Sequence, residues 1–401
     1  MTEPGNLKTN LGSLTLKNPF ILASGPPTAS GEMIRRAFKA GWGGAVIKTI
    51  RPDGMDIRDL SPRFAAWKNQ KGDLLGFENI ELLSKNSVSY WEEEITTIKR
   101  EYPDHILIAS IMGDTDPASW QNLTARVQEA GADALELNFS CPHGMPEFGV
   151  GSVIGQNPSM IRELTRMVAS DADIPVFVKL TPNITDISPA AQAAADGGAD
   201  GISAINSVQS ILGIDIESFD PLPSVCGYST SGGYSGPAVK PIGLAMVSQI
   251  ARTVRLPIMG IGGITIWQDA VEYILLGASA IQLCTTVMWN GYGIIRDMKA
   301  GMSAYLDRKG YHSPDDIRGA ALSHLKTHQA LDRSRRMYPV LGTRETCTRC
   351  GQCVTACRDG GYQAMKMSID GPVVKRDVCD GCGLCFLVCS TGSLVATQEK
   401  T

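Results

Sequence analysis

The sequence predicts an α/β protein in which a parallel, eight-stranded barrel is followed by a small cysteine-rich domain of mixed α and β structure. Two observations support this. Eight short apolar segments alternate with amphipathic helical stretches over residues 1–310, and eight of the eleven cysteines lie between Cys347 and Cys389. The first pattern is that of repeated β/α units, and the second is that of a compact site for metal-bound thiolates.

The eight predicted strands are nearly continuous runs of Val, Ile, Leu and Ala, as in a parallel sheet buried on both faces. They cover residues 20–23, 45–48, 106–111, 134–138, 175–180, 201–205, 257–261 and 279–283. Several follow a helix and a glycine directly, as in AFKAGWGGAVIK and VQEAGADALELN, which is the short loop of a β/α repeat. Eight such units predict a (β/α)8 TIM barrel. A doubly wound open sheet is the alternative, although no GxGxxG follows the first strand.

In a TIM barrel the chemistry lies at the C-terminal ends of the strands. The residues at those ends are mostly polar and include two lysines, unlike residues that only fill a core. They are Ser24, Lys48, Thr49, Asn138, Phe139, Ser140, Cys141, Lys179, Asn206, Ser207, Gly262, Gly263, Cys284 and Thr285. We therefore expect the functional site at this face of the barrel.

Composition limits the remaining organisation. Residues 311–343 are charged and predict a helical connector, and residues 344–401 form the cysteine-rich domain. The net charge of −4 predicts neither nucleic-acid binding nor attraction to anionic membranes. No signal peptide is evident at the start and no apolar run approaches ~18 residues, so we expect a cytoplasmic protein with reduced thiols.

The cysteines form two runs with one spacing, Cys-x2-Cys-x2-Cys-x3-Cys. The first run is Cys347, Cys350, Cys353 and Cys357, and the second is Cys379, Cys382, Cys385 and Cys389. In two-cluster ferredoxins the fourth cysteine of each run ligates the other cluster. We therefore predict an α+β ferredoxin-like domain with two 4Fe–4S clusters, one on Cys347, Cys350, Cys353 and Cys389, the other on Cys379, Cys382, Cys385 and Cys357.

Zinc and disulfides are the alternatives for these cysteines. Zinc sites usually use paired Cys-x2-Cys arms and leave half of each run unexplained, and disulfides conflict with the expected compartment. One departure is that Arg358 and Ser390 stand where a proline usually follows the fourth cysteine. Since such clusters move single electrons, the barrel needs a partner for two-electron chemistry, and a flavin is the obvious candidate.

Several segments together resemble one enzyme family. ALELNFSCPHGM, VFVKLTPNITDI, GGADGISAINSV, SGGYSGPAVKPI and GIGGI, with the two cysteine runs, look like dihydropyrimidine dehydrogenase. The resemblance covers the flavin- and pyrimidine-binding barrel and the ferredoxin unit, essentially the whole chain. In bacteria this unit occurs as a separate subunit. Dihydroorotate dehydrogenases share the NxSCP element.

The resemblance implies FMN at the barrel mouth. Its phosphate would lie on the loops after strands seven and eight, at Gly236, Ile261, Gly262, Gly263, Cys284 and Thr285. Ser24, Lys48 and Thr49 match residues that contact the isoalloxazine. Lys179 matches a lysine near the flavin pyrimidine ring, where a cation stabilises reduced flavin.

The resemblance also implies how a pyrimidine is bound and reduced. The matching substrate positions are Asn79, Glu81, Asn138, Phe139, Ser140, Asn206 and Ser207. Cys141 is the expected catalytic acid, because reduction of the 5,6 double bond needs hydride at one carbon and a proton at its neighbour. The Gly- and Pro-rich segment after it suits a loop that closes over substrate. Cys226 and Cys284 are expected to be structural, with Cys284 lending only its backbone to FMN.

The expected activity is therefore interconversion of uracil or thymine with the 5,6-dihydro forms. Because no dinucleotide fingerprint is present, a partner flavoprotein with FAD and an NAD(P) site should supply the electrons, in a hetero-oligomer. Two alternatives remain: a dihydroorotate dehydrogenase-type or related cyclic-imide oxidoreductase on the same barrel, and a non-catalytic ferredoxin-like carrier. Orotate carries a carboxylate that Glu81 would repel.

Overall fold

The structure, a computed structural model, describes residues 7–55, 57–114, 116–139 and 152–400. It divides the chain into two compact units, Met1–His324 and Leu325–Thr401. Within the described ranges, no helix is long and apolar enough to cross a membrane.

Eight parallel strands close into a barrel in the first unit, which confirms the predicted TIM barrel and rules out the open sheet. Each predicted segment forms one barrel strand; residues 106–111 and 134–138 match at both ends, and the ends of the others differ by at most two residues. In spatial order the strands are β10 (Gly201–Ala204), β13 (Ile258–Ile261), β14 (Ala280–Leu283), β3 (Phe20–Leu22), β4 (Gly44–Val46), β7 (Ile106–Ile111), β8 (Ala134–Asn138) and β9 (Val176–Lys179).

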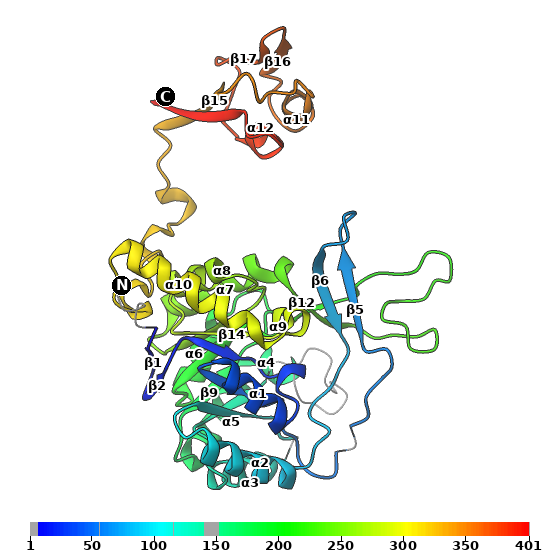
Figure 1. Cartoon of the computed structure of the whole chain (residues 1–401), viewed down its shortest axis with the longest axis vertical. Coiled ribbons are helices and arrows are strands. Elements are labelled where there is room, and N and C mark those ends of the chain that lie inside the picture. The colour runs from blue at the N-terminus through cyan, green and yellow to red at the C-terminus, as the bar shows by residue number, and fades with distance from the viewer. Residues whose placement is uncertain (1–6, 56, 115, 140–151, 401) are drawn as a thin grey trace. The chain divides into compact units, whose positions relative to one another are not determined.

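Helices surround these strands, as Figure 1 shows. Their boundaries follow local signals: Ser30 caps the first helix through its Oγ, which accepts from Met33 N, and Gly41 ends it at φ 108°. The helices are α1 (Gly31–Ala40), α2 (Val88–Glu101), α3 (Pro117–Glu129), α4 (Ser152–Gly155), α5 (Pro158–Asp171), α6 (Ser188–Asp196), α7 (Lys240–Thr253), α8 (Trp267–Leu275), α9 (Thr285–Asn290) and α10 (Ile295–Lys309).

A short hairpin, β1 (Thr9–Leu11) and β2 (Leu14–Leu16), belongs to the barrel core. Leu11 and Leu16 are fully buried in one cluster with inward residues of the strands, among them Phe177 and Met259. The hairpin thus supplies apolar filling at the opposite end of the barrel from the strand C-termini.

A four-stranded antiparallel sheet was not predicted. Its order is β11 (Val208–Ser210), β12 (Gly232–Ser235), β6 (Leu74–Asn79) and β5 (Phe64–Lys68). It arises from segments inserted after barrel strands β4 and β10, and β5 and β6 extend away from the barrel (Figure 1). This sheet brings Phe77, Asn79 and Ser235 to the strand C-termini.

The expected helical connector, residues 311–343, differs from the structure. It contains only short 3-10 helices, Pro314–Ile317, Leu322–His324 and His328–Ala330, and then strand β15 (Arg335–Leu341). The part up to residue 324 packs on the barrel, where Ile317 is buried in the main core. Helical propensity was a poor guide here because Pro339 cannot continue a helix and β15 pairs with a distant strand.

The second unit has the expected α+β composition. Strand β15 pairs antiparallel with β18 (Leu394–Lys400), and β16 (Met365–Ser368) pairs with β17 (Gly371–Val374). Helices α11 (Gln352–Gly360) and α12 (Leu384–Leu387) each begin after a glycine in the left-handed region, Gly351 and Gly383. The matching helix starts reflect the duplicated cysteine spacing.

Candidate active site

An open cavity lies at the C-terminal ends of the barrel strands. All ten predicted cofactor residues line it: Ser24, Lys48, Thr49, Lys179, Gly236, Ile261, Gly262, Gly263, Cys284 and Thr285. Five of the seven predicted substrate residues do so as well: Asn79, Glu81, Asn138, Asn206 and Ser207. The fold therefore gathers into one cavity residues that are far apart in the sequence.

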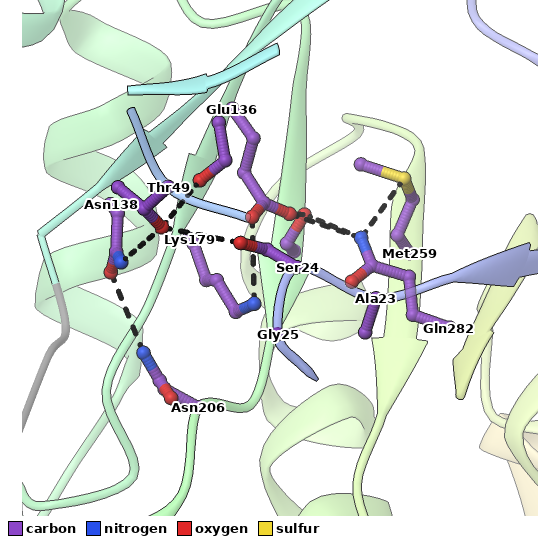
Figure 2. Close-up of polar contacts among 12 residues, drawn as sticks. Ala23, Ser24, Gly25, Thr49, Glu136, Asn138, Lys179, Asn206, Met259 and Gln282 are labelled. Atoms are coloured by element: carbon purple, nitrogen blue, oxygen red, sulfur yellow. Dashed lines mark hydrogen bonds and ion pairs between the residues drawn. The ribbon is translucent and has the colours of Figure 1, made fainter. Parts of the chain in front are cut away.

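Thr49 is the centre of a polar network on one wall of this cavity. Asn138 Nδ2 donates to Thr49 Oγ1 at 2.9 Å, and the hydroxyls of Ser24 and Ser110 lie 3.2 and 3.0 Å from the same atom. Asn206 Nδ2 in turn donates to Asn138 Oδ1 at 3.5 Å (Figure 2). These contacts hold the two amides side by side.

Both lysines of the cavity are buried and ion-paired. Lys48 Nζ lies 2.8 Å from Glu81 Oε1, which Arg63 Nε also approaches at 3.3 Å. Lys179 Nζ lies 3.4 Å from Glu136 Oε1. The cations are thus fixed in place by carboxylates, as expected for charges removed from water.

The loop after β13 has the geometry of an anion site. Gly262 and Gly263 have φ of 132° and 69°, and a Cβ at Gly263 would lie 2.5 Å from Lys240 N. Glycine is therefore required here, and a turn of this type can present backbone N–H groups to a phosphate. Asp269 holds the loop, because Thr265 N donates to its Oδ2 at 2.8 Å and Ile266 N at 3.1 Å.

Ionisation at this end of the cavity follows from burial and charge. Burial alone would raise the pKa of Asp269, but the Lys240 ammonium and the donors of Thr265 and Ile266 bring that pKa below its usual value. Burial raises the pKa of Cys284 to about 12, so this thiol stays neutral near pH 7. A neutral, partly buried thiol agrees with the structural role expected for Cys284, whereas Cys226 is exposed.

Two further observations show that the cavity fits FMN. Gln282 Oε1 is buried and has no hydrogen-bond partner among the described residues, and Gln282 lines the cavity. A donor on a bound group would satisfy this oxygen. The glycine turn at 262–263 provides the second feature, a cradle that a side chain would fill.

The predicted substrate loop is only partly described. Phe139 does not reach the cavity: its side chain is fully buried and packs edge-on against Trp120, with ring centroids 5.5 Å apart. The ring lies in the core because a residue just past a strand end can turn either into the site or into the core, and a substrate contact at Phe139 stays a prediction. Ser140 and Cys141 lie outside the described residues.

Sequence reasoning missed several polar side chains at or near the site. Glu136 and Gln282 lie inside the barrel, Arg63 pairs with Glu81, and Tyr234 lines the cavity. Glu136 and Gln282 had a usable signal, since each is a polar residue within a predicted strand of apolar residues. Tyr234, on β12, and Arg63, directly before β5, had none, because the antiparallel sheet was not predicted.

The cysteines of the second unit surround two separate hollows. Cys347, Cys350, Cys353 and Cys389 line one, and Cys357, Cys379, Cys382 and Cys385 line the other. This is the crossed grouping predicted from the spacing. Among the described residues, no three His, Cys, Asp or Glu side chains are arranged to hold a single metal ion.

One cysteine has a distinct hydrogen-bonding environment. The backbone N–H of Leu394 and further donors at Thr391 and Ser393 lower the pKa of Cys389 to about 7. Thr391 Oγ1 lies 3.7 Å from the sulfur. The thiolate, which is the form that binds metal, is therefore favoured at this position.

The sequence matches two family models. The dihydroorotate dehydrogenase model matches residues 6–306, and a 4Fe-4S dicluster domain model matches residues 340–390. The chain therefore belongs to the dihydroorotate dehydrogenase family and carries a C-terminal dicluster domain. It is an oxidoreductase whose cofactors are FMN and two 4Fe–4S clusters.

Two dihydropyrimidine dehydrogenases are similar over most of the chain. The chain is 42% identical over 355 residues to the NAD-dependent dihydropyrimidine dehydrogenase subunit PreA of Escherichia coli K12, covering 88% of this chain and 85% of the relative. It is 39% identical to the chloroplastic dihydropyrimidine dehydrogenase (NADP(+)) of Arabidopsis thaliana, over 84% and 81%.

A dihydroorotate dehydrogenase is also similar to the chain. The catalytic subunit of dihydroorotate dehydrogenase B (NAD(+)) of Pyrococcus abyssi is 42% identical over 316 residues, which are 79% of this chain and 99% of the relative.

Proposed function

We propose that the chain interconverts uracil or thymine with the corresponding 5,6-dihydropyrimidine. The observation that carries this proposal is the convergence of three side-chain amides, Asn79, Asn138 and Asn206, with the carboxylate of Glu81 in the cofactor cavity. A pyrimidine ring presents alternating N–H donors and C=O acceptors. Amides supply both functions, and a carboxylate accepts a ring N–H.

The proton needed by the reaction would come from Cys141. When bound, FMN supplies hydride transfer, and the neighbouring ring carbon then requires a proton from a positioned acid. A thiol with an ordinary pKa of ~8.5 is a competent acid, and its thiolate serves as the base in reverse. In the sequence, Cys141 stands three residues after Asn138, the last residue of β8.

The polar wall of the cavity has the task of orientation. Thr49 fixes Asn138, and Asn138 contacts Asn206, so the amides are set before a ligand arrives. Lys48 and Arg63 hold Glu81 in place from two sides.

The cysteine-rich unit would connect this site to an electron donor. We propose that its two thiolate sites take electrons one at a time from a partner flavoprotein that carries FAD and an NAD(P) site, in the cytoplasm. The name of the bacterial relative as a subunit supports a hetero-oligomer.

Substrate class can be tested with the reduced holoenzyme. Photoreduced protein is mixed anaerobically with uracil, thymine or orotate, and flavin reoxidation is followed by absorbance. We expect reoxidation by uracil or thymine and little by orotate, because Lys48 and Arg63, which could bind the orotate carboxylate, are already paired with Glu81. Rapid reoxidation by orotate alone would show that the chain is a dihydroorotate-type enzyme instead.

The role of Cys141 is tested by substitution. The flavin of Cys141→Ala protein should still be reduced, but the protein should lose most of its uracil turnover. Normal turnover would exclude Cys141 as the acid.

A further inference from the structure

Four polar side chains meet inside the barrel, one from each of four strands. They are Glu136 from β8, Lys179 from β9, Ser203 from β10 and Gln282 from β14. None is more than 4% exposed. The interior of a TIM barrel is normally filled by branched apolar residues, so this group calls for a reason other than packing.

Glu136 is the centre of the group. Its Oε1 lies 3.4 Å from Lys179 Nζ, and its Oε2 accepts from Ser203 Oγ at 2.8 Å and from Gln282 Nε2 at 3.0 Å (Figure 2). Gln282 Nε2 also contacts Ser203 Oγ at 3.2 Å. Both carboxylate oxygens are thus satisfied, which is the condition for keeping a charge inside a protein.

The group has a side that faces the cofactor cavity. Lys179 and Gln282 line the cavity, whereas Glu136 and Ser203 are not among the described residues that do. Glu136 therefore lies behind Lys179 as seen from the cavity. A residue in this place acts on a bound group through the lysine it holds.

The charge of Lys179 matters most in the reduced state of the cofactor. FMN that takes up two electrons and one proton gains one net negative charge, which a nearby cation stabilises. A carboxylate behind that cation offsets part of its field. The pair Lys179–Glu136 therefore sets how strongly the cavity favours reduced over oxidised FMN.

We propose that Glu136 is a positioning residue that holds Lys179 at the flavin and keeps the reduction potential of the FMN site low. This inference rests on the proposed function only in placing FMN in the cavity. Ser203 contributes by donating to the carboxylate, which disperses its charge.

The proposal is tested by the midpoint potential of FMN in the holoenzyme, measured by anaerobic spectroelectrochemical titration. Glu136→Gln keeps the shape of the side chain and removes its charge, so Lys179 acts unopposed and the potential rises. We expect the ratio of reduced to oxidised FMN at a fixed potential to increase about tenfold, which is about 30 mV for a two-electron couple. Glu136→Asp, which retains the charge, should stay close to the wild type.

A second variant gives a change of opposite sign. Ser203→Ala removes a donor to Glu136, so the carboxylate opposes Lys179 more strongly, and the potential should fall, with a change of about threefold in the ratio. This variant decides the matter if Glu136→Gln does not retain FMN. An unchanged or higher potential in Ser203→Ala contradicts the proposal, as does an unchanged or lower potential in Glu136→Gln.

The chain offers a matched control in Glu78. This glutamate is also fully buried and accepts from a serine, Ser210 Oγ at 2.6 Å, and burial raises its pKa. It has no lysine partner among the described ion pairs and is not among the described residues that line the cavity. Glu78→Gln should leave the potential within about twofold in the ratio. An equal rise in Glu78→Gln would mean that any buried glutamate has this effect.

Action through the lysine is tested by a double-mutant cycle. In a Lys179→Met background, Glu136→Gln should shift the potential less than half as much as in the wild type, and a full shift contradicts a route through Lys179. These potentials do not depend on turnover. If the wild-type protein does not reduce uracil but the variants shift the FMN potential as expected, the proposed substrate is overturned and the role of Glu136 is not.

Discussion

At the residue scale, the two lysines of the cavity, Lys48 and Lys179, form ion pairs with different surroundings. Lys48 shares Glu81 with Arg63, so that the carboxylate meets two cations. Lys179 faces a carboxylate that two neutral donors also satisfy. In the proposed function, the first pair would lie beside the substrate and the second beside the flavin, with Glu136 behind Lys179. Two lysine–glutamate pairs of the same composition thus differ in the groups that surround the glutamate.

Phe139 provides a residue-scale prediction that separates packing from binding. Phe139→Leu should lower the free energy of unfolding by about 1 kcal/mol, because a buried ring that packs on Trp120 is replaced by a smaller apolar group. The KM for uracil should change by less than about threefold, since the ring does not line the cavity. Chemical denaturation and steady-state kinetics measure the two quantities. A large rise in KM with unchanged stability would mean that the ring contacts substrate.

At the scale of the element, the loop between β13 and α8 depends on one carboxylate. Asp269 accepts from Thr265 N and Ile266 N and lies 2.7 Å from Lys240 Nζ, so it ties the glycine turn to the starts of α7 and α8. The pKa of Asp269 is lower in the folded protein than in the unfolded chain. The carboxylate therefore contributes its full share of the folding stability above about pH 3.9, the ordinary pKa of an aspartate. This share is lost as the pH falls through the lower pKa of the folded state. Near pH 7 the carboxylate is fully charged.

Asp269→Asn should therefore weaken FMN binding at neutral pH. We expect an increase in Kd of about tenfold, because the amide loses the charge that attracts Lys240 and accepts less strongly from the loop N–H groups. Titration of the flavin-free protein, followed by fluorescence, gives the Kd. Asp316→Asn is the matched control, since Asp316 accepts from His312 N and Ser313 N in a similar cap and is not among the described residues lining the cavity. Equal losses in both variants would point to general destabilisation.

At the scale of the whole molecule, each of the two units is built from a repeated structural motif. The barrel repeats a β/α unit eight times, and the second unit repeats a cysteine run whose third cysteine lies on a helix. Because the fourth cysteine of each run lines the hollow of the other, the two metal sites are tied together. Loss of one ligand should therefore affect the cluster of the other run.

Cys357→Ser tests this crossing. The cluster expected on Cys379, Cys382 and Cys385 should be lost or changed, while the one on the first run remains, and iron should fall from about eight to about four atoms per chain. Iron analysis and EPR of the dithionite-reduced protein measure this. Cys226→Ser, at an exposed cysteine of the barrel, should keep the full iron content. Loss of the cluster on Cys347 and Cys350 instead would show uncrossed ligation.

Much of this plan follows from the sequence, for identifiable physical reasons. The barrel strands are buried on both faces, so they are continuous apolar runs in the sequence. The glycine turn of the cavity, Gly262 and Gly263, directly follows one of these runs. The two lysines of the cavity were predicted because they stand at the C-terminal ends of such runs. The antiparallel sheet was missed because its strands are short and half-exposed, and β15 because its pairing partner lies far along the chain. The burial of Phe139 and the partners of Lys179 depend on tertiary packing, which periodicity does not report.

The central claim is that one chain joins a flavin, two clusters and a pyrimidine site. Its most direct test is the anaerobic absorption spectrum of the isolated holoenzyme before and after addition of dihydrouracil. We predict flavin and iron–sulfur absorption at the start and bleaching of the flavin band on addition, with dihydroorotate giving little change. A flavin band that dihydrouracil leaves intact, while dihydroorotate bleaches it, would contradict the account.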